Sequence, residues 1–239
     1  MENGMTRPTL GIMLLDTSFP RIPGDVGNEL SYNFPIRLKT ITGATVQRVV
    51  FEADPTLLAA FIDGARELEA AGVAAITSSC GFLSPLQEQV AKAVRVPVFL
   101  SSLLQVSIAY TLTQSRVAII TANAASLTDL VLRGAGIAPH IPLAIAGMEE
   151  VQAFREPILQ DGAELQVEQI ERGIVALARR LLHDYPDIGS FVLECHNLAP
   201  YGRAVQSATG KPVFDIIDFA RWIYGTIEKR TFPHHASVS

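Results

Sequence analysis

Two stretches of the chain, residues 73–99 (VAAITSSCGFLSPLQEQVAKAVRVPVF) and residues 190–214 (SFVLECHNLAPYGRAVQSATGKPVF), share one pattern. In each stretch an apolar run ends at a cysteine, and a Pro-Val-Phe sequence follows after sixteen further residues. The cysteines are Cys80 and Cys195. A short apolar run bounded by turn residues is typical of a buried strand. Two identical spacings in one chain predict a duplicated unit with one cysteine in each half.

The rest of the chain alternates short apolar runs with longer amphipathic stretches, which predict strands and helices respectively. Such alternation is typical of parallel sheets covered by helices on both faces. We therefore expect an α/β fold of two pseudo-symmetric parallel-sheet lobes. The expected strands are residues 9–16, 45–51, 73–79, 97–100, 116–121, 142–146, 190–194 and 212–215. The expected helices include residues 55–71, 84–94, 126–133 and 161–183, with Ser126 as a cap and Asp161 opening a capping box.

The division into lobes follows from the repeat. We expect the first lobe to comprise residues 1–105 and 214–239 and to carry Cys80. The second lobe is expected over residues 106–213 with Cys195. Ligands gather at the carboxyl ends of strands in open parallel sheets. The two halves therefore bring both thiols to one shared cleft, which places the active site between the lobes.

Composition narrows the possible functions. The chain has 239 residues, a formal net charge of −5 and two cysteines. This charge argues against nucleic-acid binding, and no apolar run reaches the roughly 20 residues that span a bilayer. Two cysteines make no disulfide framework and fit a reducing, cytoplasmic location. The sequence has no phosphate-binding glycine loop, CxxC pair or clustered histidines, so we expect no metal, pyridoxal phosphate or nucleotide cofactor.

The two cysteines suggest acid–base chemistry at a single carbon atom. Inverting a stereocentre needs one group that removes a proton and another that delivers a proton to the opposite face. Ser84-Pro85 and Pro200 predict helix starts just after Cys80 and Cys195, and helix N-termini stabilise a thiolate and attract a carboxylate. The alternative interpretation of each cysteine is a buried, small apolar side chain.

The sequences Thr77-Ser78-Ser79-Cys80-Gly81-Phe82 and Leu193-Glu194-Cys195-His196-Asn197-Leu198-Ala199-Pro200-Tyr201 resemble the two cysteine motifs of the aspartate/glutamate racemase superfamily. The resemblance covers the chain from about residue 9 to residue 225. It implies two pseudo-symmetric lobes and chemistry at a carbon next to a carboxylate or carbonyl, without pyridoxal phosphate or metal. Gly81-Phe82 and His196-Asn197 depart from the Asn-Thr and Thr-His pairs that are usual in the family's amino-acid racemases.

Other candidate site residues flank the cysteines or end neighbouring strands. Asp16-Thr17-Ser18 resembles the first active-site loop of the superfamily, although Asp16 also suits a turn cap. Glu194 is interpreted equally well as a buried structural partner, and Arg21 as a solvated loop charge. With Cys80 and Cys195 as catalytic residues, the predicted substrate-binding residues are Asp16, Thr17, Ser79, Gly81, Phe82, Thr121, Asn123, His196 and Asn197.

These observations predict an isomerase: a cofactor-independent racemase or epimerase acting on an amino acid or a related carboxylate or hydantoin. The first alternative is an enzyme like maleate isomerase or arylmalonate decarboxylase, and the second is a small-molecule binding protein without activity. Phe82 beside the first thiol predicts a ligand with a partly apolar end, rather than free aspartate or glutamate. We also expect a homo-oligomer.

Overall fold

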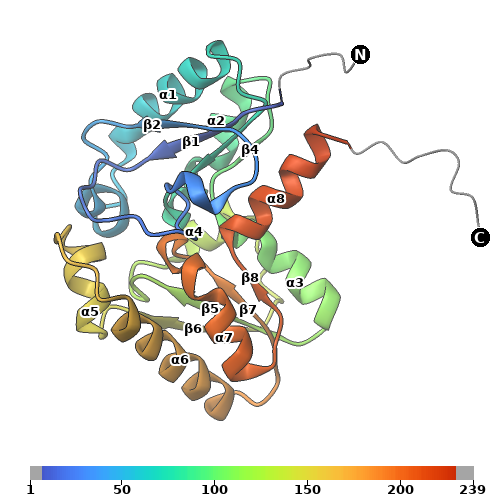
Figure 1. The fold of residues 1–239 in the computed structure, drawn as a ribbon. Helices are drawn as coiled ribbons and strands as arrows, with labels where there is room; N and C mark the ends of the chain where they lie inside the picture. The colour runs from blue at the N-terminus through green and yellow to red at the C-terminus, as the bar shows by residue number, and fades with distance from the viewer. Residues whose placement is uncertain (1–6, 230–239) are drawn as a thin grey trace, which may run out of the picture.

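The computed structural model describes residues 7–229 and contains two four-stranded parallel sheets (Figure 1). The strand order is β2-β1-β3-β4 in the first sheet and β6-β5-β7-β8 in the second. Each half therefore repeats one arrangement, which confirms the expected α/β fold with two lobes. The strands are β1 (Leu10–Leu14), β2 (Ile36–Thr40), β3 (Ala75–Ser78), β4 (Val98–Phe99), β5 (Arg116–Thr121), β6 (Leu143–Gly147), β7 (Ile188–Leu193) and β8 (Val213–Phe214).

The register of the sheets repeats as well. Ile76 lies opposite Val98 in the first sheet, and Phe191 lies opposite Val213 in the second. In each lobe the residue four positions before the cysteine thus pairs with the valine of Pro-Val-Phe. The repeat in the sequence therefore corresponds to equivalent positions in space, with each cysteine just beyond an inner strand.

Helices cover both sheets (Figure 1). α1 packs against α2 in the first lobe, and α6 packs against α7 in the second. In α6 the side chains of Ile170, Ile174, Leu177 and Leu181 recur every three to four residues and are buried, as a helix facing a core requires. The helices are α1 (Leu58–Ala70), α2 (Gln87–Ala93), α3 (Val106–Thr113), α4 (Asp129–Gly134), α5 (Gln152–Phe154), α6 (Val167–Asp184), α7 (Gly202–Thr209) and α8 (Ile216–Ile227).

The expected strand at residues 45–51 is wrong. Gln47–Phe51 forms the π-helical turn η2, and the strand beside β1 is β2. Val46, Val49 and Val50 are buried, and their spacing of three and four residues suits a helical turn. β2 is an edge strand with mostly exposed or half-buried side chains, so its sequence IRLKT lacks the apolar run of an inner strand.

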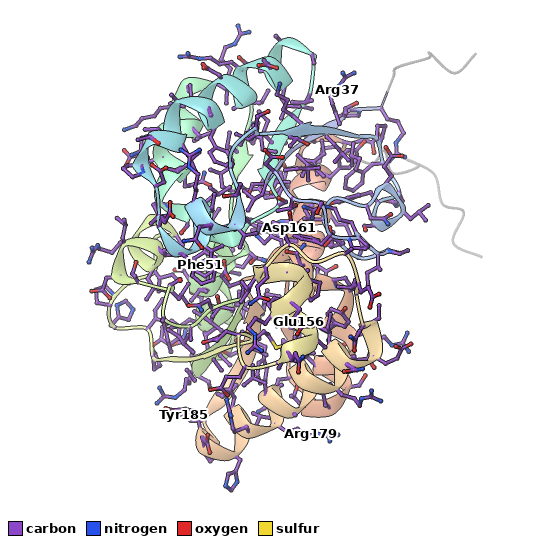
Figure 2. The ribbon with its side chains drawn as sticks, turned by 90° about the vertical axis from the view of Figure 1, so that its left-hand side faces the viewer. Arg37, Phe51, Glu156, Asp161, Arg179 and Tyr185 are labelled. Atoms are coloured by element: carbon purple, nitrogen blue, oxygen red, sulfur yellow. The ribbon has the colours of Figure 1, made fainter. Side chains whose placement is uncertain are left out.

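Several expected helix starts are also wrong. Ser84, Pro85 and Pro200 lie inside 3-10 helices that begin directly after Cys80 and Cys195. α4 begins at Asp129 rather than at a cap on Ser126, whose N–H donates to Asn123 Oδ1 over 2.9 Å. α6 begins at Val167, and Asp161 lies outside it with a φ of 54°. The Asp161 carboxylate instead accepts hydrogen bonds from two N–H groups of the loop after β1. It therefore connects the second lobe to the first near their junction (Figure 2).

Packing joins the two lobes. One cluster of buried apolar side chains extends from Met13 in the first half to Val205 in the second. Phe214, which the sequence division assigns to the first lobe, pairs with Val192 in the second sheet. α8 then returns and packs against β3 of the first sheet. Residues 1–6 and 230–239 of the expected first lobe lie outside the described residues. Within residues 7–229, no helix is long and apolar enough to cross a membrane.

Candidate active site

A small cavity of about 20 Å³ lies at the carboxyl ends of the inner strands. Four of the segments that line it follow β1, β3, β5 and β7 directly, as expected for a ligand site in parallel sheets. Both lobes therefore contribute to its wall. The lining residues are Leu15, Thr17, Phe19, Arg21, Val46, Val50, Ser79, Cys80, Phe82, Ala122, Ile158, Leu159, Glu194, Cys195 and Asn197.

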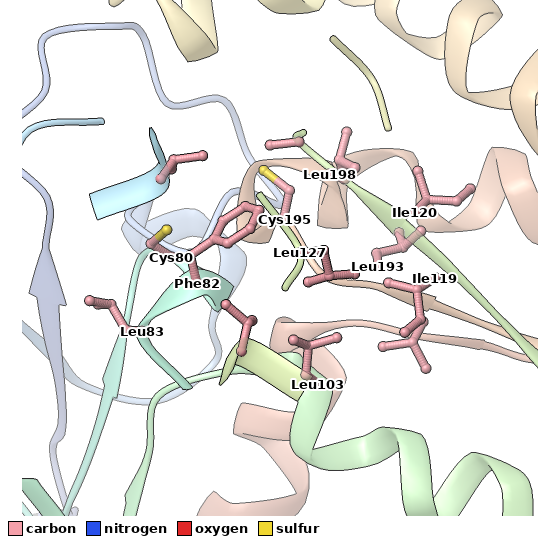
Figure 3. Packing of buried hydrophobic residues seen from close by; sticks show 14 of the residues in the cluster. Cys80, Phe82, Leu83, Leu103, Ile119, Ile120, Leu127, Leu193, Cys195 and Leu198 are labelled. Carbon is pink, nitrogen blue, oxygen red and sulfur yellow. The ribbon is translucent and has the colours of Figure 1, made fainter. Parts of the chain in front are cut away.

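Both cysteines line this cavity, and both are free thiols. Each is the residue before a 3-10 helix: Cys80 precedes η4 (Gly81–Leu86), and Cys195 precedes η7 (His196–Tyr201). Figure 3 shows the two sulfur atoms in one region, beside the ring of Phe82. A backbone N–H at the start of each helix lowers the thiol pKa, from Phe82 for Cys80 and from Asn197 for Cys195.

Burial nevertheless raises the pKa of both thiols. The second cause is the negative charge of Glu194, which raises the pKa of Cys80 and of Cys195. The expectation that helix starts bring these pKa values toward neutrality is therefore wrong, because desolvation of a thiolate outweighs one N–H donor. The positive charge of Arg21 in the cavity wall acts in the opposite direction and lowers the pKa of Cys80.

Glu194 is the acidic residue of the cavity wall. It follows β7, has no exposed surface and lines the cavity. Thr121 Oγ1 donates a hydrogen bond of 2.7 Å to its Oε2, whereas Oε1 is buried without a partner. Burial raises the pKa of the Glu194 carboxyl to about 7, although the contacts from Thr121 and the backbone of Ala122 lower it.

Gly81 makes room for this carboxylate. A Cβ atom at residue 81 would lie 2.3 Å from both the carbonyl oxygen and Oε1 of Glu194. Real Cβ atoms do not approach so closely, so a larger residue would displace Glu194 or the turn. Gly81 thus permits close contact between the cysteine segments of the two lobes. It does not itself line the cavity.

A chain of hydrogen bonds connects Cys195 to the loop after β1. The Cys195 thiol donates to Asn197 Oδ1 over 3.7 Å, and Asn197 Nδ2 donates to Asp25 Oδ2 over 2.7 Å. Arg21 donates to Asp25 Oδ1 over 2.9 Å and to Thr17 Oγ1 over 3.1 Å. The guanidinium is largely buried, so Arg21 is a cation of the cavity wall rather than a solvated loop charge.

His196 lies behind the cavity wall. Its Nδ1 lies 2.9 Å from the carbonyl oxygen of Ser78, and its Nε2 accepts the N–H of Ser102 over 3.1 Å. Burial lowers the pKa of His196 to about 4, so the ring is neutral near pH 7. Both ring nitrogens are occupied, and His196 therefore joins backbone segments instead of contacting a ligand.

The structure places the predicted site residues in two groups. Thr17, Ser79, Phe82 and Asn197 line the cavity with the two cysteines. The other predicted residues form contacts elsewhere: Asp16 accepts the N–H of Gly43 over 2.8 Å, Thr121 donates to Glu194, Asn123 accepts the N–H of Ser126, and Gly81 and His196 lie behind the wall.

Sequence reasoning missed much of the cavity wall. Glu194 carried a signal, because a carboxylate inside an apolar strand run needs a special environment. Arg21 carried a weaker one, as a cation in a loop rich in turn residues. Nothing in the sequence marked Ile158 and Leu159, which reach the cavity from the π-helical turn η6 (Arg155–Leu159). Over residues 7–229, no group of three or more His, Cys, Asp or Glu side chains is placed to hold a metal ion.

The curated proteins that are similar in sequence to this chain are named as lyases. No protein-family model matches the chain. A dimethylsulfoniopropionate lyase of Durusdinium sp. clade D is 30% identical over 217 residues, which cover 87% of this chain and 71% of that protein. Dimethylsulfoniopropionate lyases 7 and 6 of Emiliania huxleyi are 33% and 32% identical over 88% of this chain. The matched region covers 64% and 57% of these two longer proteins.

Comparison with solved structures gives the fold of the aspartate/glutamate racemase superfamily. A liganded arylmalonate decarboxylase mutant superposes with a TM-score of 0.63 at 18% identity, covering 92% of each chain. An aspartate racemase homologue from Pyrococcus horikoshii gives 0.57 at 17% identity, covering 93% of this chain and 99% of that one. Allantoin racemase from Klebsiella pneumoniae gives 0.58 at 14% identity, covering 96% of both. The resemblance drawn from the two cysteine motifs is therefore confirmed for the fold.

Proposed function

This chain belongs to the family of the dimethylsulfoniopropionate lyases, and on that premise we propose that it cleaves dimethylsulfoniopropionate, or a close β-sulfonio carboxylate, by β-elimination. The observation that carries the proposal is one cavity with two thiols, a cation and a buried carboxylate: Cys80, Cys195, Arg21 and Glu194. A small zwitterion that loses a proton next to its carboxylate suits this set of groups.

The racemase or epimerase activity expected from the sequence is wrong, and so is the assignment to the isomerases. Curated relatives at 30–33% identity are named as lyases. The error has a physical origin. Equivalent thiols in two lobes satisfy the geometry of two-base inversion, but the same carbon acid can lose a leaving group once its proton is removed. The fold and the thiols do not distinguish these reactions.

The proposed elimination balances as follows. A thiolate at Cys80 or Cys195 takes a proton from the carbon next to the substrate carboxylate. The electron pair of that C–H bond forms the carbon–carbon double bond, and the bond between the β-carbon and sulfur breaks. The products are acrylate, neutral dimethyl sulfide and a thiol, which returns its proton to water. No oxidant, reductant or water molecule is consumed.

Two features of the cavity support this reaction. Burial and Glu194 keep the pKa of both thiols high, and a sulfonium ion beside them supplies the positive charge that favours a thiolate. Arg21 offers a charge-assisted partner to the substrate carboxylate, which becomes more electron-rich as the proton leaves. The apolar walls at Phe19, Phe82 and Ile158 suit the two methyl groups.

The experiment is turnover of dimethylsulfoniopropionate by the wild-type protein, Cys80→Ala and Cys195→Ala, with dimethyl sulfide measured in the headspace. Elimination needs one base, so the turnover rate should fall by about 10²–10⁴-fold in the variant that loses this base. The other variant keeps part of the activity. Circular dichroism checks that each variant is folded. Wild-type rates in both cysteine variants would refute the assignment of a thiol as the base.

A further inference from the structure

One buried oxygen atom on the cavity wall lacks a partner. Within residues 7–229, the buried side-chain oxygens without a hydrogen-bond partner belong to Glu149, Ser190 and Glu194. Only Glu194 lines the cavity, and its unpartnered Oε1 lies against the backbone of Gly81. Buried polar atoms without partners are uncommon and need an explanation. A positively charged ligand group in the cavity would offset the buried negative charge of this carboxylate.

The surroundings fix the position of this carboxylate. Thr121 Oγ1 holds Oε2, and the backbone of Ala122 also stabilises the charged form. The absent side chain at Gly81 leaves the space that Oε1 occupies. These contacts hold the Glu194 carboxylate in one place while leaving one oxygen unsatisfied.

The cavity wall also carries a cation that does not neutralise Glu194. Arg21 forms its ion pair with Asp25, and no ion pair joins Arg21 to Glu194 among the described residues. The wall therefore presents an anion and a cation at separate places. A ligand that matches both charges is a zwitterion, with a carboxylate at one end and a permanently charged group at the other.

We propose that Glu194 recognises the cationic end of the substrate, and that its carboxylate selects onium propionates over neutral propionates of the same shape. The inference rests on the proposed function, because the onium group is the sulfonium of the substrate. Glu194 is then a specificity-determining residue and not the base. The thiols lie beside the same charge, so the bound cation offsets the effect of Glu194 on them.

The reaction itself predicts how Glu194 acts on the kinetics. The sulfonium charge disappears as the carbon–sulfur bond breaks, so the attraction to Glu194 is strongest for bound substrate and weakens toward the transition state. An interaction of this kind lowers KM without raising kcat. Glu194→Gln should therefore raise KM by at least about tenfold and should raise kcat rather than lower it.

Binding of two matched ligands provides the test. One is the propionate that bears a trimethylammonium group at its β-carbon, and the other bears a tert-butyl group at the same carbon. They share their shape and their carboxylate and differ by one positive charge. Calorimetry compares both ligands with the wild-type protein, Glu194→Gln and Glu149→Gln. Glu149 is the matched control, since it also has an unpartnered buried oxygen but does not line the cavity.

We expect wild-type protein and Glu149→Gln to bind the cationic ligand at least about tenfold more tightly than the neutral ligand. In Glu194→Gln this ratio should fall below about threefold. Equal affinities in the wild-type protein would overturn the proposal even if Glu194→Gln does not fold. A preference that survives in folded Glu194→Gln would also overturn it.

Failure of the proposed function is distinguishable from failure of this inference. A wild-type preference for the cationic ligand that is lost in Glu194→Gln, without release of dimethyl sulfide, supports the recognition by Glu194 and refutes the reaction. Wild-type protein that releases dimethyl sulfide while Glu194→Gln keeps the full preference refutes the recognition and supports the reaction.

Discussion

Replacing Glu194 with neutral glutamine should raise the free energy of unfolding, by an amount that depends on pH. Burial raises the pKa of this carboxyl from its ordinary value of 4.5 to about 7. Between these two values the unfolded chain has released the proton while the folded chain keeps it. The folded state then binds more protons than the unfolded state, so the free energy of unfolding falls as pH rises.

The size of the effect follows from the two pKa values. The difference between 4.5 and about 7, at 1.36 kcal/mol per pH unit, gives about 3 kcal/mol. This contribution is present below pH 4.5 and is lost as pH rises through about 7. Glu194→Gln lacks the titration. Its stability relative to the wild-type protein should therefore rise by about 3 kcal/mol between about pH 4.5 and about pH 8.

Urea denaturation of both proteins across this pH range gives the difference directly, and contributions from all other groups cancel to first order. The neighbouring titratable groups are the thiols of Cys80 and Cys195, neutral His196 and the cation Arg21. Thr121→Val is the control, since losing its hydrogen bond raises the pKa of Glu194 further and moves the transition to higher pH. A stability difference that does not change with pH would refute a buried, titrating Glu194.

Three further variants test other parts of the site. Arg21→Met should raise KM for the substrate by about 10–100-fold, because a charge-assisted hydrogen bond to the carboxylate is lost; an unchanged KM would remove Arg21 from substrate binding. Gly81→Ala should lower the free energy of unfolding by about 1–3 kcal/mol in urea titrations, since its Cβ would overlap Glu194, and wild-type stability would contradict this contact. Asp161→Ala removes the acceptor for the N–H groups of Ser18 and Phe19, so tryptic cleavage after Arg21 should become about fivefold faster. Asp161→Asn keeps an acceptor, so trypsin should cleave this variant at close to the wild-type rate. Equal cleavage rates in the two variants would exclude the hydrogen bond as the cause.

The sequence predicts the fold well because both halves of the chain repeat one pattern of residues. Cys80 and Cys195 follow inner strands whose apolar runs are unambiguous, and each Pro-Val-Phe opens the neighbouring strand. Edge strand β2 was missed because its side chains are largely exposed and its pattern is weak. The apolar run at Gln47–Phe51 predicts a strand although it forms a buried turn, because short apolar runs do not reveal their period.

The site is less predictable than the fold because its wall depends on loops. Arg21 reaches the cavity only through its contacts with Thr17 and Asp25, which the chain order does not reveal. His196 next to a cysteine suggested a ligand contact, yet its ring bonds to the backbone of Ser78 and Ser102. The sequence motifs do not identify the reaction class, because removal of a proton beside a carboxylate precedes both inversion and elimination.

Identifying the products formed from dimethylsulfoniopropionate tests the central claim most directly. A thiolate beside a sulfonium ion has two courses: it takes a proton and eliminates dimethyl sulfide, or it attacks a methyl group. Nuclear magnetic resonance of the reaction mixture, with the mass of the recovered protein, distinguishes them. We predict acrylate and dimethyl sulfide in equal amounts, with unchanged protein mass. Methylthiopropionate together with a protein heavier by one methyl group, or substrate left intact, would contradict the account.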